Sequence, residues 1–597
     1  MATSTRLAAA RRTTLTTCLC AALAAGTGIG HADAVSGVTG NPSATRHASF
    51  SLFSNLSKRS GAREHVVSGN LIPVTKCEDD GTDGTLRKAI EGAADGDTID
   101  MSGLSCSLIT LQSGALVSPV PDLILKGPGI DALTIDGNDT DRVLQGAYLD
   151  ISDLTIAHGS VTTGGGGVLA NGDLTLTRAK IYSCHVANAT NDGVGGGALV
   201  LGNLTMHDAV IAGNKVDGTD HAVGGGVAVG GTATLFDSTI AGNDAEASQA
   251  QAYGGGLFAN GMITLHGSSI TANVAHSTGG SAYGGGMHSP MSDLAVLDGS
   301  TITNNVVLTD LLGSHGGGVS SGTIYQQGPA TVTLYNSTVS GNMAGSTCDG
   351  CTVGGGGVYA FDKIVAKYST VDNNQAQCTD AMNACSASGG GLTSVGSQSD
   401  SRIFLYNSTI STNSALGSGQ VGTSGTGGGM KLGVSEPFVA DNTTIAFNHA
   451  SDAGGGILAS TDANNPAEMI STIVSNNDSG AGSDDISPDP LANGATITGS
   501  NDLVLKTPAS VTLPADTVTT DPGLLPLTTG DGGITATHPL PPGSVAIDAG
   551  LNPTSLKCDQ RGFPNHRVEG AAPDIGAYEA GEKHLFADNF DGTSICQ

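Results

Sequence analysis

The sequence predicts an all-β solenoid, in which short strands stack in successive coils, and two observations lead to this prediction. The 597 residues contain 90 glycines and no tryptophan, with 4% aromatic and 13% charged residues, which is unlike a helical or ordinary α/β domain. A repeat of about thirty residues also indicates stacked coils, because one such unit cannot bury its apolar face alone. The repeat is marked by glycine triplets that end at Gly167, Gly197, Gly226, Gly256, Gly286, Gly318, Gly357, Gly391, Gly429 and Gly456.

Each repeat unit is predicted to form short strands joined by turns. In residues 233–243, apolar and polar residues alternate with the period of a strand, while Asp237, Gly242 and Asn243 indicate turns. Most units contain a tetrapeptide that begins with Ile or Val and ends in Asn. If these asparagines are buried in equivalent places, each can donate to the amide oxygen of its neighbour, which predicts a ladder. The predicted ladder comprises Asn214, Asn243, Asn273, Asn305, Asn342, Asn374, Asn413, Asn448 and Asn476.

The N-terminal segment predicts export. Arg6, Arg11 and Arg12 precede an apolar run at residues 15–25, and Ala32 and Ala34 supply a small-x-small cleavage site. We therefore expect a signal peptide at residues 1–34, a variable segment at 35–70, an N-terminal cap with a short helix at 71–98, and the solenoid at 99–505. The cap is expected because an open first coil would otherwise expose an edge to pairing with other chains.

The pattern resembles right-handed parallel β-helix proteins, and it has features of two exported bacterial families. Residues 196–199, Gly-Gly-Ala-Leu, with the Ile-x-x-Asn tetrapeptides, resemble the repeats of polymorphic outer-membrane adhesins. Residues 521–527, 542–550, 559–562 and 573–579 resemble the choice-of-anchor Q domain, assigned here to 506–580 and followed by a tail at 581–597. These resemblances imply a right-handed parallel β-helix, and a protein secreted from, or displayed on, a Gram-negative bacterium.

Nine cysteines remain after leader cleavage, and an oxidising compartment favours disulfides. Cys77 and Cys106 flank the predicted cap helix and are placed to join it to the first coil. Cys184 takes the ladder position in the first clear coil, which predicts a free, buried thiol. The remaining candidates are two loop pairs, which by count could instead hold zinc, and a C-terminal pair. These are Cys348 with Cys351, Cys378 with Cys385, and Cys558 with Cys596.

Two carboxylates are weak candidates for catalysis. Asp208 and Asp237 occupy equivalent places in neighbouring coils, and a glycosidase needs two carboxylates about 5–10 Å apart. The equivalent positions in successive coils, which we call their column, also hold the residue types that tolerate left-handed turns. This favours a structural role. The later members of this column are Gly267, Gly299, Asn336, Asn407 and Asn442.

The lysines and arginines between residues 151 and 500 are not expected to cluster in adjacent coils, apart from isolated pairs. This disfavours a lyase, which needs cations to neutralise the carboxylate of a uronate. They are Arg178, Lys180, Lys215, Lys363, Lys367, Arg402 and Lys431.

The predicted function is a non-catalytic, adhesin-like or glycan-binding scaffold, and the alternative is a polysaccharide-active lyase or glycoside hydrolase. We expect a monomer without cofactor, metal or membrane-spanning segment, and a glycan or host-surface ligand. The net charge of −30 disfavours nucleic acid. Segments after each Asn, such as 215–223, 244–253 and 414–426, are expected to form the contact face, and Tyr253 and Tyr283 to stack.

Overall fold

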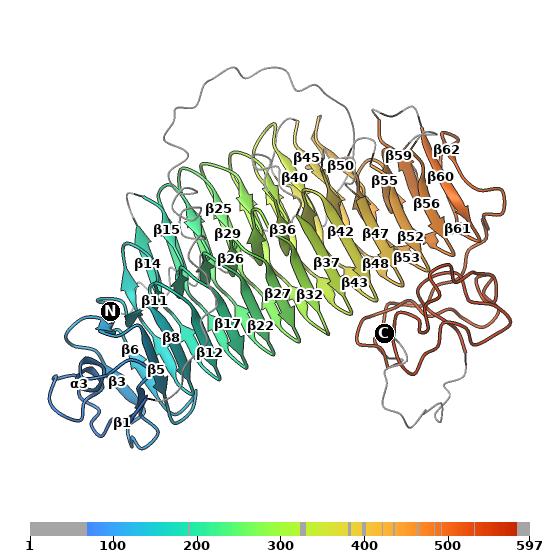
Figure 1. The fold of residues 1–597 in the computed structure, drawn as a ribbon. Helices are drawn as coiled ribbons and strands as arrows, with labels where there is room; N and C mark the ends of the chain where they lie inside the picture. The colour runs from blue at the N-terminus through green and yellow to red at the C-terminus, as the bar shows by residue number, and fades with distance from the viewer. Residues whose placement is uncertain are drawn as a thin grey trace.

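The computed structural model describes residues 69–581, except 189–190, 323–329, 380–383, 397–401, 421, 434–435, 462–464, 481, 483, 491, 493 and 531. These residues form a rod of five sheets whose strands pair in parallel, coil upon coil, and confirm the predicted parallel β-helix (Figure 1). The predicted signal peptide, most of the variable segment, Cys596 and nearly all of the tail lie outside the described residues.

Sheet A runs the length of the rod. The residues in its strands alternate between the interior and the outer face, as in β22, where Ala233 and Leu235 are buried. Its strands are β1 Leu71–Pro73, β2 Thr98–Asp100, β5 Asp122–Lys126, β8 Tyr148–Ser152, β12 Leu174–Thr177, β17 Leu204–His207, β22 Ala233–Phe236, β27 Ile263–His266, β32 Leu294–Leu297, β37 Thr331–Tyr335, β42 Lys363–Lys367, β47 Arg402–Tyr406, β52 Phe438–Asp441, β56 Ala467–Ile470, β60 Ala495–Ser500 and β62 Val511–Thr512. Strands of this sheet therefore lie on both sides of the expected 99–505 limits.

Sheets B and C complete the main coil. The strands of sheet B are β3 Leu108–Thr110, β6 Thr134–Asp136, β9 Thr155–Ala157, β13 Lys180–Tyr182, β18 Val210–Ala212, β23 Thr239–Ala241, β28 Ser269–Thr271, β33 Thr301–Thr303, β38 Thr338–Ser340, β43 Thr370–Asp372, β48 Thr409–Ser411, β53 Thr444–Ala446, β57 Ile473–Ser475 and β61 Leu503–Val504. The strands of sheet C are β4 Leu116–Val117, β7 Leu144–Gly146, β11 Val168–Ala170, β16 Ala198–Val200, β21 Val227–Val229, β26 Leu257–Ala259, β31 Met287–Ser289, β36 Val319–Ser321, β41 Val358–Ala360, β46 Leu392–Ser394, β51 Met430–Lys431, β55 Ile457–Ala459 and β59 Ile486–Pro488.

Sheets D and E form a second, smaller loop of each coil. The strands of sheet D are β10 Ser160–Val161, β14 His185–Asn188, β19 Lys215–Gly218, β24 Asp244–Ala247, β29 Val274–Ser277, β34 Val306–Thr309, β39 Met343–Ser346, β44 Gln375–Cys378, β49 Ser414–Leu416, β54 His449–Ala450 and β58 Asp478–Ser479. The strands of sheet E are β15 Gly193–Val194, β20 Ala222–Val223, β25 Ala252–Tyr253, β30 Ala282–Tyr283, β35 Ser314–His315, β40 Thr352–Gly354, β45 Ser386–Ser388 and β50 Ser424–Thr426. The segments expected to emerge as variable loops are thus largely strands.

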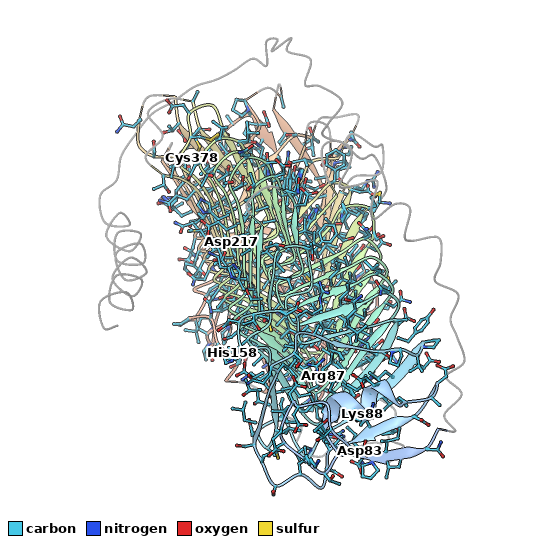
Figure 2. The ribbon with its side chains drawn as sticks, turned by 90° about the vertical axis from the view of Figure 1, so that its left-hand side faces the viewer. Asp83, Arg87, Lys88, His158, Asp217 and Cys378 are labelled. Carbon is cyan, nitrogen blue, oxygen red and sulfur yellow. A yellow bond between two sulfur atoms is a disulfide. The ribbon has the colours of Figure 1, made fainter. Side chains whose placement is uncertain are left out.

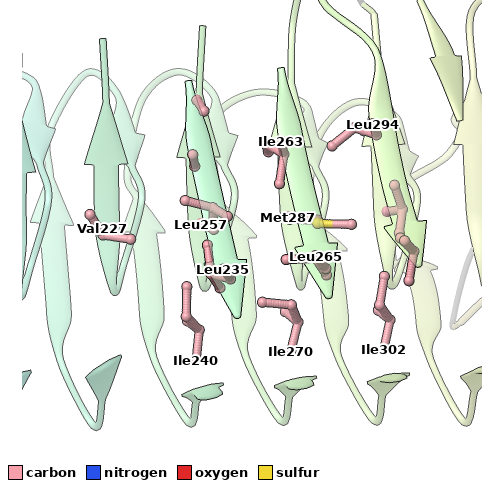
Figure 3. Close-up of a cluster of buried hydrophobic side chains, with 14 of the residues drawn as sticks. Val227, Leu235, Ile240, Leu257, Ile263, Leu265, Ile270, Met287, Leu294 and Ile302 are labelled. Atoms are coloured by element: carbon pink, nitrogen blue, oxygen red, sulfur yellow. The ribbon is translucent and has the colours of Figure 1, made fainter. Parts of the chain in front are cut away.

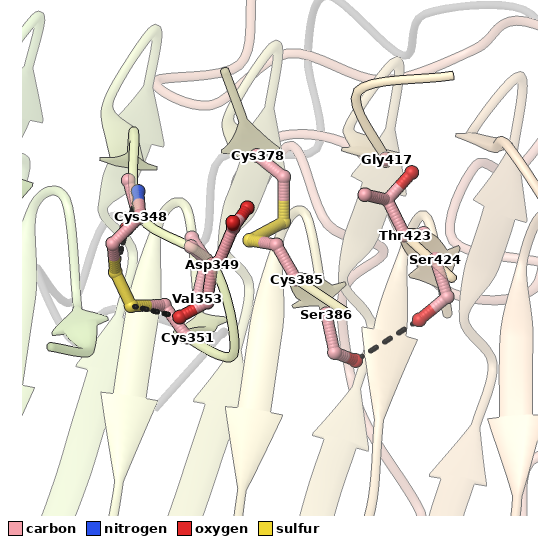
Figure 4. The surroundings of a disulfide bond; sticks show 12 residues. Cys348, Asp349, Cys351, Val353, Cys378, Cys385, Ser386, Gly417, Thr423 and Ser424 are labelled. Atoms are coloured by element: carbon pink, nitrogen blue, oxygen red, sulfur yellow. Dashed lines mark hydrogen bonds between the residues drawn. A yellow bond between two sulfur atoms is a disulfide. The ribbon is translucent and has the colours of Figure 1, made fainter. Parts of the chain in front are cut away.

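Two apolar cores lie inside the rod. The main lobe, enclosed by sheets A, B and C, is filled by large aliphatic side chains such as Leu235, Ile240 and Leu257 (Figure 3). The side lobe, between sheets D and E, is filled mostly by small ones such as Ala245 and Ala275. Two disulfides lie in the side lobe, joining Cys348 to Cys351 and Cys378 to Cys385 (Figure 4).

The glycine triplets form the waist between the two lobes. At Gly224, φ is +63°, the left-handed region that favours glycine. A Cβ on Gly225 would lie 2.5 Å from the carbonyl carbon of Asp244, and one on Gly226 would lie 2.9 Å from the amide of Asn243. The two walls of the coil thus meet so closely that a side chain does not fit, which explains why three glycines recur.

The asparagine ladder lies at the waist. In a typical rung, the backbone N–H and Nδ2 of Asn243 both donate to Oδ1 of Asn273, at 3.0 and 2.9 Å. The first donor is the backbone N–H of Cys184, whose side chain is buried and makes no disulfide with a described cysteine. The amides all donate towards the C-terminal end, where Asn477 donates to Oδ1 of Asp485.

One predicted rung is wrong: the ninth is Asn477, and Asn476 lies in a left-handed turn with φ 58°. The reason is the strand register, because Ile445 pairs with Val474 and not with Ile473. Val474 faces the main lobe, so the ladder position falls three residues later, at Asn477.

A second ladder, of hydroxyl side chains, follows the corner between sheets A and B. The backbone N–H of Ser238 donates to Oγ of Ser268 at 3.1 Å, and similar bonds recur in later coils. At the C-terminal end, the backbone N–H of Thr472 donates to Oδ1 of Asp502 at 2.9 Å. Both ladders therefore end at an aspartate.

The two ends of the rod are covered differently. Helix α3 (Leu86–Glu91) buries Leu86, Ala89 and Ile90 in the main lobe, and Cys77 is joined to Cys106. The C-terminal region, defined here as residues 518–581, packs on the outer face of sheet B in the later coils, on the underside of the rod in Figure 1. Cys558, the predicted partner of Cys596, is buried there. Within the described residues, no helix has the length and apolar character needed to cross a membrane.

Candidate functional site

Asp208 and Asp237 lie in the turn between sheets A and B, with exposed side chains and φ of 50° and 48°. Their column keeps this left-handed turn in later coils, as at Gly267 with φ 57° and Asn407 with φ 44°. Asn and Asp tolerate this conformation better than most residues. The turn accounts for both aspartates without a catalytic role.

A charged cluster lies on the outer face of sheet D, where Figure 2 labels Asp217. Lys215 contacts the carboxylates of Asp217 at 2.7 Å and Glu246 at 2.9 Å, and His185 lies 2.7 Å from Asp217. Although partial burial opposes it, hydrogen bonding to the two carboxylates raises the pKa of Lys215. The lysine is therefore held protonated, which is unsuited to a general base.

The aromatic residues of neighbouring coils stack on one another in two columns. His207, Phe236 and His266 stack in adjacent coils, with centroids 4.8 and 5.0 Å apart and nearly parallel rings. Tyr253 and Tyr283 stack as predicted, at 5.5 Å, but are only 6% and 2% exposed. The inner faces of these rings are already in contact with each other, so these columns serve packing.

Three cations gather on the outer face of sheet A, contrary to the expectation of isolated pairs. Lys363 on β42 lies directly opposite Arg402 on β47, and Lys367 lies opposite Tyr406. The alternating residues Ile364, Ala366, Ile403 and Leu405 are buried, so Lys363, Lys367 and Arg402 share the outer face. We call these three residues the cationic patch.

Sequence reasoning missed the cationic patch because 39 residues separate Lys363 from Arg402. The signal was present in the strands themselves. Aligning Lys363-Ile-Val-Ala-Lys367 with Arg402-Ile-Phe-Leu-Tyr406 by their buried positions gives the observed register.

Two carboxylates lie on the same face, in the coils that follow the patch. Asp441 on β52 lies opposite Tyr406, and Glu468 on β56 lies opposite Val439. We call Asp441 and Glu468 the acidic pair. The two residues lie on adjacent strands, about 4.8 Å apart, and are offset by two residues, or about 6.6 Å, along the strand direction. Their Cα atoms are therefore about 8 Å apart.

The two carboxylates have different environments. Glu468 is exposed, whereas Asp441 is only 5% exposed and its Oδ1 accepts no hydrogen bond from a described residue. Burial, together with the neighbouring Glu468 carboxylate, raises the pKa of Asp441 to about 6. Burial and the same two carboxylates also raise the pKa of Tyr406, which stays a phenol at neutral pH.

The C-terminal region lies along one border of this face. Asn407 and Asn442 directly follow Tyr406 and Asp441, and their side chains each donate at 2.7 Å to backbone carbonyls of that region, at Cys558 and Leu551. The C-terminal region therefore holds the turn that directly follows Tyr406 and Asp441, the last outward-facing residues of these two strands.

Among the described residues, no group of three His, Cys, Asp or Glu side chains is arranged to hold a metal ion. In the later coils, the outer face of sheet A presents the cationic patch and the acidic pair side by side.

No protein-family model and no curated protein sequence matches the chain. Among solved structures, the crystal structure of pectate lyase Pel9A is similar, with 11% sequence identity and a TM-score of 0.27. The match covers 87% of this chain and 98% of that one. At this level of similarity the description of the fold rests on the strand ladders themselves.

Proposed function

We propose that this protein is an exported scaffold that binds anionic glycans on the outer face of sheet A. The observation that carries the proposal is the cationic patch, in a chain whose net charge is −30. Lys363, Lys367 and Arg402 place three positive charges on one face of two neighbouring strands, and this concentration of charge supports binding of an anion.

The chemistry of the patch fits the carboxylates or sulfates of a polysaccharide. A guanidinium binds a carboxylate or sulfate through two parallel hydrogen bonds, and a lysine adds a mobile charge. A repeating anionic polymer laid along sheet A would meet Lys363, Lys367 and Arg402 within two coils.

The location of the protein is part of the proposal. The leader-like N-terminus, the disulfides and the choice-of-anchor Q-like motifs support secretion or display on the surface of a Gram-negative cell. There, a rod carrying a glycan-binding face would act as an adhesin-like scaffold.

Binding of polygalacturonate and a sulfated glycan to the purified chain, compared with a neutral glucan, tests the proposal. We expect the anionic polymers to bind, with affinity falling as salt rises. The double variant Lys363→Ala/Arg402→Ala should lose about tenfold in affinity or more, which is about 1.4 kcal/mol. The control Lys88→Ala/Lys180→Ala removes the same charge elsewhere and should bind normally. Equal losses in both double variants would contradict the assignment of the face.

A further inference from the structure

We propose that the acidic pair, Asp441 and Glu468, hydrolyses glycosidic bonds of the anionic glycan bound beside it. This inference rests on the proposed function for its substrate class, and adds an activity to it. Hydrolysis of a glycosidic bond needs one carboxylic acid and one carboxylate on either side of the bond, about 5–10 Å apart. The acidic pair lies on the same outer sheet face as the cationic patch, and its register places the two Cα atoms about 8 Å apart.

Asp441 has the environment of a general acid. A buried carboxyl oxygen nearly always has a hydrogen-bond partner in a folded protein. The Oδ1 of Asp441 accepts none from a described residue, although burial is almost complete. The raised pKa of Asp441 keeps part of the carboxyl protonated near pH 6. A protonated carboxyl with a free oxygen is suited to donate to a glycosidic oxygen.

Comparison with the ladder aspartates shows how Asp441 differs from a structural aspartate. The two oxygens of Asp485 accept four hydrogen bonds, from Asn477, Leu505 and Lys506. Asp502 accepts one from Thr472, and its Oδ2, like Oδ1 of Asp441, has no partner among the described residues. Asp485 and Asp502 face inward or into a corner and end a ladder. Asp441 ends no ladder, because its strand alternation places it on the outer face, opposite Tyr406 and Ile470.

The neighbours of Asp441 agree with a reaction centre. Glu468 is exposed, so it stays accessible to water, and Tyr406 lies opposite Asp441 on the neighbouring strand. Asp502, whose pKa is raised to about 8 mainly by burial, also interacts with Asp441. Two carboxylates in contrasting environments are the arrangement from which acid and base roles follow.

The reaction is a hydrolysis by water. Asp441 donates its proton to the glycosidic oxygen as the bond between that oxygen and the anomeric carbon breaks. Glu468 accepts a proton from water as the water oxygen bonds to the anomeric carbon. The products are a new reducing end and a new sugar hydroxyl, while Asp441 is left ionised and Glu468 protonated. Proton exchange with solvent restores both groups.

The experiment measures new reducing ends from polygalacturonate and a sulfated glycan, with binding measured in parallel on the same full-length chain. We expect Asp441→Asn and Glu468→Gln each to lose at least a hundredfold in rate while affinity stays within about threefold. Asp208→Asn/Asp237→Asn, the matched control for removed carboxylates, should retain the wild-type rate. The wild-type rate should fall above about pH 6, where Asp441 ionises.

The outcomes separate the two proposals. Glycan binding without any new reducing ends would overturn the hydrolysis and leave the binding function standing. If neither binding nor new reducing ends are detected, the proposed binding function and the proposed hydrolysis are both overturned. Release of unsaturated products, detected by their ultraviolet absorbance, would overturn the proposed hydrolysis, because such products come from elimination. Since Glu468 is exposed, its variant also keeps the test valid if Asp441→Asn fails to fold.

Discussion

The main lobe and the side lobe belong to the same coils but hold together by different means. Each coil of the main lobe buries several large aliphatic side chains, such as Leu265 and Ile270, and each contributes about 1.5–3 kcal/mol. The side lobe buries mainly alanine, and a methyl group contributes only about 0.8 kcal/mol. The side lobe has two disulfides, and its sheet E ends at β50 while sheet A continues to β62. Within the coils, these two crosslinks therefore lie in the lobe with the smaller apolar side chains, while the third disulfide, Cys77–Cys106, lies at the N-terminal end of the rod.

The waist on which both lobes depend should be the most sensitive position. In Gly255→Val, the new Cβ would lie 2.3 Å from the backbone of Val274, so the walls must separate in both lobes. We expect a loss above about 4 kcal/mol, or failure to fold. Gly103→Ala, where a Cβ meets nothing within 4 Å, is the control. Urea denaturation followed by circular dichroism measures both, and a stable Gly255→Val protein would disprove the close approach.

The two cores can be compared directly by truncating one side chain in each. Leu265→Ala in the main lobe should cost about 2–5 kcal/mol, because a cavity forms among tightly packed neighbours. Ala275→Gly in the side lobe should cost about 1 kcal/mol, from a lost methyl and added chain entropy. Both are read from urea midpoints. A larger loss at Ala275 would reverse the ranking of the two lobes.

The crosslinks should matter locally. Cys378→Ser/Cys385→Ser removes one side-lobe disulfide, and loop closure predicts a loss of about 2 kcal/mol. We expect faster hydrogen exchange in residues 375–388 and little change in sheet A. The variant Cys184→Ser, which breaks no disulfide, controls for loss of sulfur. Uniformly faster exchange along the rod would show that the disulfide acts on the whole fold.

Replacing the aspartate at the end of each ladder with asparagine should change stability in opposite directions. Asp485→Asn places an NH2 group against backbone donors at Leu505 and Lys506, and should cost about 1–3 kcal/mol. Asp502→Asn keeps the acceptor for Thr472 and removes a carboxyl whose pKa burial raises to about 8. Because this folded-state pKa exceeds the ordinary 3.8, the native state binds more protons between those values, and stability falls as pH rises from about 4 to about 8.

Asp502→Asn should therefore be more stable than the wild type at pH 8.5 and lack this fall, whereas the difference should shrink towards pH 4. Urea midpoints at both pH values check the prediction. A variant less stable than the wild type at pH 8.5 would show that Asp502 is held ionised.

The sequence predicted the features that repeat in every coil, and missed those set by register between coils. Glycine triplets and asparagines recur because the waist needs the same residues each time. Asn476 and Asn477 are adjacent in the sequence, so the repeat alone does not decide which of them joins the ladder. The pairing of Ile445 with Val474 identifies Asn477. The side lobe escaped prediction because its strands are short and bury small residues such as Ala245 and Ala275, which indicate a core less clearly than large aliphatic residues do. The acidic pair was missed because opposition across coils is visible only once each strand is aligned.

The asparagine ladder has a consequence for how such a rod changes during evolution. Every rung between Asn214 and Asn448 accepts from the coil before it and donates to the coil after it. A whole coil duplicated or deleted by recombination thus meets the same partners on both sides. Each event changes the length of the rod by about 4.8 Å, while the helix at one end and Asp485 at the other are unaffected. The reach of the molecule is therefore a property that selection can adjust in fixed steps.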